Sequence, residues 1–305
     1  MSIVSGADPG AGPVEMLSSH DNEFPPAEAT MGKPYHLLTY NRQEGRNVTV
    51  IAHRGASAYY PDNTLISLEG AIEMEADMAE IDVLLTRDGV PVVIHNERLS
   101  RLSGGHGRVA HYTLQELKKL DFGYSKKGFT GEQIPTLDEV LSLCKNTIAL
   151  NIEIKPGAVQ ELVNGGVEEK CVELVYYHDM EKHVVFSGFD PRIFLNLRII
   201  DPDIATAVLY DGRYYPENLK PSQIVEHLGV DAFNCSTREL SAEWMDDLKG
   251  ADIPVNVYTV NSEKAMDRFL DMGASGLFTN KPDMLIRVLR RRKVPAFIER
   301  FYQVT

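Results

Sequence analysis

The chain has 305 residues and a formal net charge of −13 at pH 7, with charged and apolar fractions that are ordinary for a globular protein. This length suffices for one large α/β domain or two small ones. The negative charge argues against a nucleic-acid partner. No apolar stretch approaches the ~20 residues that a membrane-spanning helix needs.

The cysteines and the first residues bear on the cell compartment. Cys144, Cys171 and Cys235 match no metal or redox spacing, so we expect them to be small buried hydrophobes. An odd, unpaired set is typical of a reducing compartment. The first residues lack the basic start and the apolar run of a signal peptide. We therefore predict a cytoplasmic protein.

Two domains are predicted along the chain. Residues 1–46 are rich in Gly, Pro, Ala, Ser and acidic residues without a clear period, which predicts a partly flexible N-terminal extension. Residues 47–305 form the second domain, where apolar runs alternate with helical patterns.

The second domain begins with a strand, a helix and a hairpin. Residues 48–53 form an apolar run that ends on His53, and the helix that follows is capped by Asn63 or Thr64. A strand over 78–86, the turn signal TRDG and a short return strand then lead to His95. The hairpin interrupts a simple βα alternation and brings the second histidine back toward the strand.

Acidic residues gather on two of the predicted strands. Glu80 and Asp82 lie two residues apart, so both project to one face of their strand. In the strand over 148–155, Glu153 and Lys155 likewise share a face. Buried carboxylates are costly unless they are compensated, and hard divalent cations prefer carboxylate oxygens. The three carboxylates therefore predict a site for Mg²⁺ or Ca²⁺, and the alternative is a salt-bridge network with Arg54 and Lys155.

The segment from about 97 to 137 is irregular and is predicted to be a small insertion after the second strand. It holds one short helix over 113–120, with Thr113 and Glu116 in capping-box positions. Regular alternation follows it. Helices are predicted at 137–145, 167–178, 191–198, 221–229, 241–250, 263–273 and 283–293, and strands at 148–155, 183–190, 203–210, 230–236, 253–261 and 274–280.

Eight strands that alternate with helices predict an α/β fold of the (β/α)8 TIM-barrel type. A doubly wound open sheet is the alternative, but its Gly-rich phosphate fingerprint is absent from the sequence. In a TIM barrel, functional residues lie at the C-terminal ends of strands. His53, Glu80, Asp82 and Glu153 fall at or near such ends, which supports their assignment to one site.

Three ordered stretches resemble the glycerophosphodiester phosphodiesterase family: HRGASAYYPDNT, AEIDVLLTRDGVPVVIHN and IEIK. Order and spacing match from Val48 to about Asn280. The resemblance implies a phosphoric diester hydrolase that converts a glycerophosphodiester to glycerol 3-phosphate and an alcohol with the help of a divalent metal ion. It also implies that the insertion shapes the substrate pocket.

Nine residues make up the predicted site. The catalytic acid and base are His53 and His95, the phosphate contacts are Arg54 and Lys155, and the metal ligands are Glu80, Asp82 and Glu153. Phe189 and Tyr258 stand at positions where the family resemblance implies a pocket wall, and plain core packing is the alternative for both. The small-molecule glycerophosphodiester is the expected partner, while the alcohol, the choice between Mg²⁺ and Ca²⁺, and the oligomeric state stay open.

The chain departs from the family pattern at four positions. Asp62, Asn96, His111 and Asn280 stand where the family commonly has Glu, Asp, Asp and Asp. Asn96 matters most, because a carboxylate there would favour protonation of the neighbouring histidine more than an amide does. Two rival functions stay open: a lysophospholipase D-type activity on lysolipids, and a non-catalytic phosphodiester-binding protein.

Overall fold

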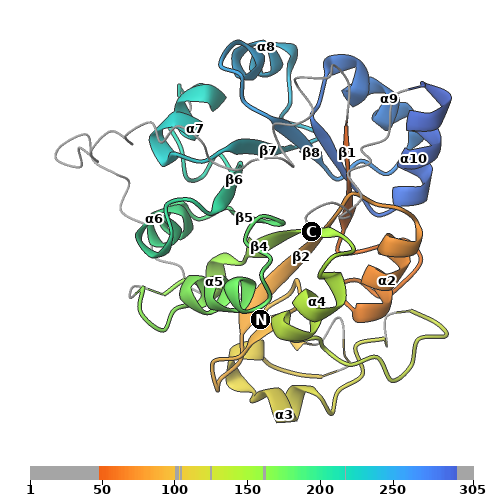
Figure 1. Ribbon diagram of the computed structural model, residues 1–305, viewed down its shortest axis with the longest axis vertical. Coiled ribbons are helices and arrows are strands. Elements are labelled where there is room, and N and C mark those ends of the chain that lie inside the picture. Colours follow the sequence, from red (N-terminus) through yellow and green to blue (C-terminus); the bar gives the residue numbers. More distant parts are fainter. Residues whose placement is uncertain are drawn as a thin grey trace, which may run out of the picture. The chain divides into compact units, whose positions relative to one another are not determined.

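Eight parallel strands close into a barrel in the computed structural model, which describes residues 48–99, 103, 105–123, 126–160, 163–216 and 218–293 (Figure 1). The barrel strands are β1 (Thr49–His53), β2 (Met78–Leu85), β4 (Ala149–Ile154), β5 (Val184–Gly188), β6 (Ala205–Leu209), β7 (Ala232–Ser236), β8 (Val255–Tyr258) and β9 (Gly276–Thr279). Each pairs in parallel with its neighbours, and pairing of β1 with both β9 and β2 closes the ring. The predicted TIM barrel is confirmed. The extension predicted for 1–46 lies outside the described residues.

Helices surround the strands, as Figure 1 shows. They are α2 (Leu65–Glu73), α3 (Leu114–Leu117), α4 (Leu137–Cys144), α5 (Val167–Tyr177), α6 (Pro191–Ile200), α7 (Pro221–Leu228), α8 (Ala242–Gly250), α9 (Glu263–Met272) and α10 (Pro282–Arg291), with 3₁₀ turns η2 (Val109–His111) and η3 (Pro156–Ala158). Except for α3 and α4, which come after the hairpin and the insertion that follow β2, each α-helix is the next one after a barrel strand, so the βα alternation predicted from the sequence holds around the rest of the ring.

Polar caps fix where several of these helices begin. Thr64, rather than Asn63, caps α2, because its side chain accepts a hydrogen bond from the backbone N–H of Ser67. Thr113 and Glu116 form the predicted capping box at α3. The α3 helix ends at Leu117, three residues earlier than predicted. Capping satisfies backbone donors that have no partner inside the helix.

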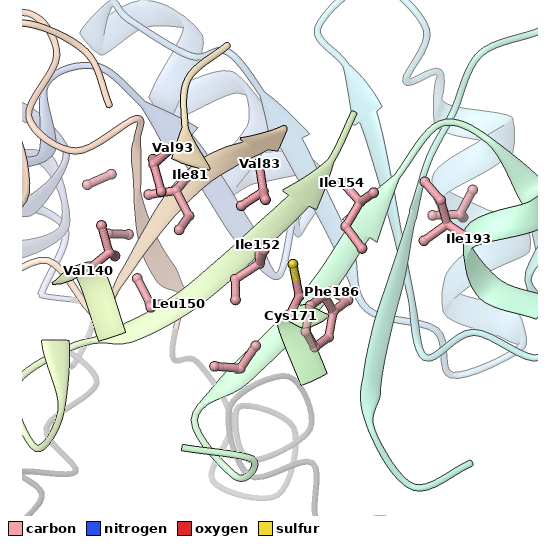
Figure 2. Close-up of a cluster of buried hydrophobic side chains, with 14 of the residues drawn as sticks. Ile81, Val83, Val93, Val140, Leu150, Ile152, Ile154, Cys171, Phe186 and Ile193 are labelled. Atoms are coloured by element: carbon pink, nitrogen blue, oxygen red, sulfur yellow. The ribbon is translucent and has the colours of Figure 1, made fainter. Parts of the chain in front are cut away.

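The outward faces of β2, β4 and β5 pack against helices, and Figure 2 shows part of this core. Ile81, Ile152 and Phe186 are completely or almost completely buried there, and Cys171 of α5 lies among them. All three cysteines are buried and free, which confirms the expectation that they are small core residues. Within the described residues, no helix has both the length and the apolar character to cross a membrane.

The inward faces of the strands carry apolar and polar layers. Ile51, Met78 and Phe278 belong to a buried apolar cluster inside the barrel. Two residues further along β1 and β2 stand His53 and Glu80, which pair with each other in the strand register. Strand side chains alternate with a period of two, so these polar residues lie on the same inward face as the apolar layer.

Strand β2 continues past the barrel into a hairpin with β3 (Pro91–Val93), and the predicted insertion follows it. Ile94, next to His95, donates its backbone N–H to the carbonyl of Asp82, which returns the chain to the middle of β2. At the far end of the hairpin, the Asp88 carboxylate accepts from the backbone N–H of Leu114 at the start of α3. The turn signal of the sequence thus also anchors the insertion.

Candidate active site

Strand register brings the predicted acidic residues together. His53 pairs with Glu80 across β1 and β2, and Asp82 pairs with Glu153 across β2 and β4. The three carboxylates each offer an oxygen, and these oxygens lie within 4.8 Å of one another. Their residues are 2%, 0% and 8% exposed, so the cluster is buried at the ends of adjacent strands.

Two cations face the carboxylates. Lys155 Nζ lies 2.5 Å from Glu153 Oε1 and 3.2 Å from Asp82 Oδ1. Arg54 Nε lies 3.3 Å from Asp82 Oδ2 but makes no hydrogen bond with it, which leaves a buried donor without a partner. The salt-bridge network considered as an alternative is therefore present, and it centres on Asp82.

Glu80 is compensated differently from its two neighbours. Its Oε2 accepts the backbone N–H of Arg54 at 2.9 Å and lies 3.9 Å from His53 Nε2. Burial and the nearby charges of Asp82 and Glu153 raise the pKa of Glu80 well above its ordinary value. The positive charges of Arg54 and Lys155 thus balance only part of the negative charge that three ionised carboxylates would carry.

Asp82 and Glu153 show how the surplus charge is divided. Burial alone would raise the pKa of Asp82, but Lys155 and Arg54 hold that pKa well below its usual value. Burial and the charge of Asp82 raise the pKa of Glu153 to about 7, against the opposing effect of Lys155. Without a further cation, Asp82 is therefore the carboxylate that stays ionised.

His53 is fixed through its ring nitrogen Nδ1, which lies 2.7 Å from Asn280 Oδ1. Because an amide oxygen only accepts, this bond requires the proton on Nδ1 and leaves Nε2 facing Glu80. Burial and the charge of Arg54 lower the pKa of His53 to about 4. The imidazole is accordingly neutral at pH 7, and its Nε2 is unprotonated.

His95 lies near enough to Asp82 to sense its charge and, like His53, has an asparagine partner. Its Nδ1 is 2.9 Å from Asn96 Oδ1. Burial lowers the pKa of His95, while the charge of Asp82 acts in the opposite direction. Asn96, singled out as a departure from the family pattern, therefore touches the histidine that it was expected to influence.

The loop between β1 and α2 supplies two more side chains. Asn63, with φ +60°, donates its Nδ2–H to Asp82 Oδ2 at 2.8 Å and accepts the Asp82 N–H at 3.2 Å. Asp62 lies 3.5 Å from Arg54 Nη1. Sequence reasoning considered Asn63 only as a helix cap. Its place in the Asp-Asn-Thr motif was visible, but its contact with Asp82 was not.

The two predicted aromatic residues lie together at the ends of β5 and β8. Phe189 and Tyr258 are half-buried, and their rings meet edge to face with centroids 6.3 Å apart. The Tyr258 hydroxyl donates to the carbonyl of Tyr210 at 3.2 Å. Tyr258 is near enough to Glu153 for its charge to raise the tyrosine pKa, after the larger effect of burial. The aromatic pair thus includes a residue that senses the charge of the acidic cluster.

The donor set fits a hard divalent cation. It consists of carboxylate oxygens only, and it retains uncompensated negative charge after both basic side chains are counted. Mg²⁺ and Ca²⁺ prefer such oxygen ligands, whereas Zn²⁺ sites commonly include nitrogen or sulfur. A buried acidic triad that can hold a metal ion is thus part of the site.

Known proteins with similar sequences include several named glycerophosphodiester phosphodiesterases. The sequence profile of the glycerophosphoryl diester phosphodiesterase family matches residues 53–284. A glycerophosphodiester phosphodiesterase of Caldanaerobacter subterraneus is 35% identical over 246 residues, which cover 79% of this chain and 98% of the relative. One from Bacillus subtilis is 31% identical over 257 residues, covering 79% and 86%.

Solved structures agree with the sequence relatives. A phosphodiesterase of Oleispira antarctica, in complex with the product sn-glycerol-3-phosphate, has a TM-score of 0.72 and 29% identity, with 79% of this chain and 96% of that chain covered. A glycerophosphodiester phosphodiesterase of Thermotoga maritima has a TM-score of 0.63 and 26% identity, covering 79% and 98%.

Fold and site together define a TIM-barrel enzyme of the phosphoric diester hydrolase class. The family match spans three quarters of the chain and includes His53 and the acidic cluster. The chain belongs to the glycerophosphoryl diester phosphodiesterase family.

Proposed function

We propose that this protein hydrolyses glycerophosphodiesters to glycerol 3-phosphate and an alcohol, with a divalent metal ion and two histidines as the acid and base. One observation carries the proposal: three buried carboxylates whose oxygens lie within 4.8 Å of one another adjoin His53 and the cations Arg54 and Lys155. The product bound to the Oleispira relative, sn-glycerol-3-phosphate, supports the choice of substrate.

Arg54 and Lys155 are the proposed substrate-binding residues. Arg54 is suited to phosphate oxygens because its planar guanidinium matches two of them at once, and its buried Nε has no hydrogen-bond partner in the described chain. Lys155 adds a second positive charge beside Asp82. Together with a bound divalent cation, Arg54 and Lys155 would make the site locally positive for an anionic substrate, although the whole chain is acidic.

Glu80, Asp82 and Glu153 are the proposed metal ligands. Mg²⁺ or Ca²⁺ held there would neutralise charge that develops on the phosphoryl oxygens. Lys155 would keep contact with Asp82 or Glu153 and so orient them. Asn63 holds Asp82 from the opposite side, through its side-chain amide and the Asp82 backbone.

The two histidines divide the proton transfers. One imidazole removes a proton from the attacking hydroxyl, either of water or of the substrate glycerol, as oxygen bonds to phosphorus. The other, which enters this step as the imidazolium, gives its Nε2 proton to the alcohol oxygen as the bond from that oxygen to phosphorus breaks. Where the glycerol hydroxyl has attacked, water then opens the resulting cyclic phosphate to give glycerol 3-phosphate. Asn280 and Asn96 each accept from an Nδ1–H, which leaves both Nε2 atoms for these transfers.

The test is release of glycerol 3-phosphate from glycerophosphocholine, measured with Mg²⁺, with Ca²⁺ and after chelation by EDTA. We expect turnover that EDTA abolishes and that either ion restores. A parallel arm with lysophosphatidylcholine separates the lysolipid activity. Substrate binding without turnover under any of the metal conditions would overturn the proposal in favour of a non-catalytic binding protein.

A further inference from the structure

The loop between β1 and α2, residues 54–64, places much of the anion-binding machinery. It carries Arg54, Asp62 and Asn63, which contact Asp82 or one another. Arg54 itself has φ +57°, in the left-handed region that is unfavourable for a residue with a side chain. Such a conformation persists only where surrounding contacts determine it strongly.

Lys126, a residue of the insertion, binds the backbone of this loop. Lys126 Nζ donates to the carbonyl of Ser57 at 2.5 Å and to the carbonyl of Tyr60 at 2.6 Å. Both acceptors are backbone oxygens, so the ammonium fixes the path of the loop rather than the rotamer of a side chain. Hydrogen bonds with a charged partner are about twice as strong as neutral ones.

Packing reinforces the same contact. The ring of Phe129 meets the ring of Tyr60 edge to face, with centroids 5.6 Å apart. Lys126 donates its own backbone N–H to Gly123 at 2.9 Å, and Phe129 donates to Lys126, so this part of the insertion is itself folded. The insertion thus holds the 54–64 loop through a charged and an aromatic contact.

Lys126 is linked to the site by charge as well as by geometry. Asp62 is near enough to interact electrostatically with Lys126, and Asp62 also lies 3.5 Å from Arg54 Nη1. The order Lys126, Asp62, Arg54, Asp82 therefore alternates in sign from the insertion to the acidic cluster. A shift of the loop at Ser57 or Tyr60 would disturb the contacts of the Arg54 guanidinium with both Asp62 and Asp82.

We propose that Lys126 is a positioning residue for phosphodiester binding, which holds the 54–64 loop so that Arg54 meets the phosphate. This inference rests on the proposed function. It assigns the insertion a specific task, and it concerns a residue that touches neither the acidic cluster nor the histidines. Misplacement of a binding group by about 1 Å can cost about 100-fold in rate.

The principal test compares Lys126→Met with Lys127→Met. Lys127 is the adjacent, exposed lysine, and its replacement controls for the loss of one positive charge in the same segment. We expect kcat/KM for glycerophosphocholine to fall about 10- to 100-fold in Lys126→Met and by less than about twofold in Lys127→Met. Equal activity of the two variants would refute the inference.

A double-mutant cycle with Arg54→Lys separates positioning from general stabilisation. If Lys126 acts through Arg54, Lys126→Met costs less than about threefold when the guanidinium fork is already absent. An equal loss in both backgrounds would show that Lys126 only supports the fold, and would overturn the proposal.

Two further variants keep the test decisive if Lys126→Met fails to unfold cooperatively. Lys126→Arg keeps a cation with several donors and is expected to retain activity within about threefold, whereas Lys126→Gln is expected to fall as Lys126→Met would. Loss in Lys126→Arg as large as in Lys126→Gln contradicts the inference. A wild-type protein that releases no glycerol 3-phosphate refutes the proposed function and this inference together; an active wild type with an insensitive Lys126 refutes the inference alone.

Discussion

The barrel interior holds buried polar residues on two sides, and they behave differently. On β2 and β4 the inward polar residues include the carboxylates Glu80, Asp82 and Glu153, while on β7 and β8 they include the amides Asn234 and Asn256. All are at most 8% exposed. The amides share a hydrogen bond of 2.9 Å between Asn256 Nδ2 and Asn234 Oδ1.

The comparison separates polar residues that support the fold from those that cost stability for the sake of a site. The neutral amides share one hydrogen bond and leave Asn234 Nδ2 and Asn256 Oδ1 without a partner in the described chain, but they carry no net charge. The carboxylates repel, and the charge of Asp82 adds to burial in raising the pKa of Glu80 and of Glu153. Burying charge is favourable only with close counter-charges, and here Lys155 and Arg54 supply too few. Functional sites are where such local conflicts are expected in natural proteins.

The strongest way to test this contrast is to remove the histidines beside the acidic side. We expect His53→Ala and His95→Ala each to lower kcat by about 10²–10⁴-fold, because acid–base groups typically contribute that much. Both variants should unfold cooperatively near the wild-type temperature. Near-normal kcat in a folded variant would make that histidine structural.

Metal ions should stabilise the acidic side in a pH-dependent way. The folded pKa of Glu153, about 7, exceeds its ordinary value of 4.5, so its favourable contribution to metal-free stability is lost as pH rises through 7. A cation needs the ionised form, so stabilisation by Mg²⁺ or Ca²⁺ should grow from pH 6 to pH 8 and reach about 2.7 kcal/mol at 100 times Kd.

The measurement is the thermal midpoint with and without metal at each pH, for the wild type and Glu153→Gln. The variant should show a smaller metal response and a metal-free stability less dependent on pH between 4.5 and 7. A metal response that is the same at pH 6 and pH 8 would argue against carboxylate ligands.

A substitution in the amide pair should change the free energy of unfolding rather than turnover. Asn256→Ala removes the donor to Asn234 Oδ1 and leaves a buried acceptor without its partner, which typically costs about 1–3 kcal/mol. Urea unfolding measures this loss. We expect kcat of the folded variant to change by less than about threefold, since the pair lies outside the acidic cluster. A loss of turnover at unchanged stability would contradict the proposed division between the two sides.

The smallest expected effect concerns the residue that touches His95. Asn96→Asp places a carboxylate at the position now 2.9 Å from Nδ1, which should raise the pKa of His95 through stabilisation of the imidazolium. In the plot of kcat/KM against pH, the acid limb then shifts to higher pH if His95 is the base. If His95 is the acid, the alkaline limb shifts to higher pH instead. Two superimposable plots would exclude coupling between the two residues.

Much of the fold was predictable because each barrel strand is a short apolar run between helical patterns. The meeting of Glu80, Asp82 and Glu153 was also predictable, since period-two alternation and the strand-end rule of TIM barrels both point there. The pairing of Asp82 with Glu153 depends on register between strands separated by the whole insertion, and no local signal encodes it.

Two contacts could not be predicted from the sequence, for physical reasons. Asn63 precedes an apolar helical run, where Asn is also a normal cap, so its bond to Asp82 was hidden by a local alternative. Lys126 lies in a segment without period and binds backbone carbonyls more than sixty residues away. Side-chain bonds to distant backbone leave no pattern, because any residue can offer the carbonyl.

The short strand β3 has a consequence for self-association. A closed barrel has no exposed strand edge, but the hairpin adds a strand whose outer side would offer unpaired N–H and C=O groups to another chain. The returning insertion meets this side: the Val93 N–H donates to the carbonyl of Pro135, and Val92 bridges Thr136. The same insertion whose Lys126 contacts the 54–64 loop thus also pairs with the outer side of β3, which leaves fewer backbone groups open to edge-to-edge association.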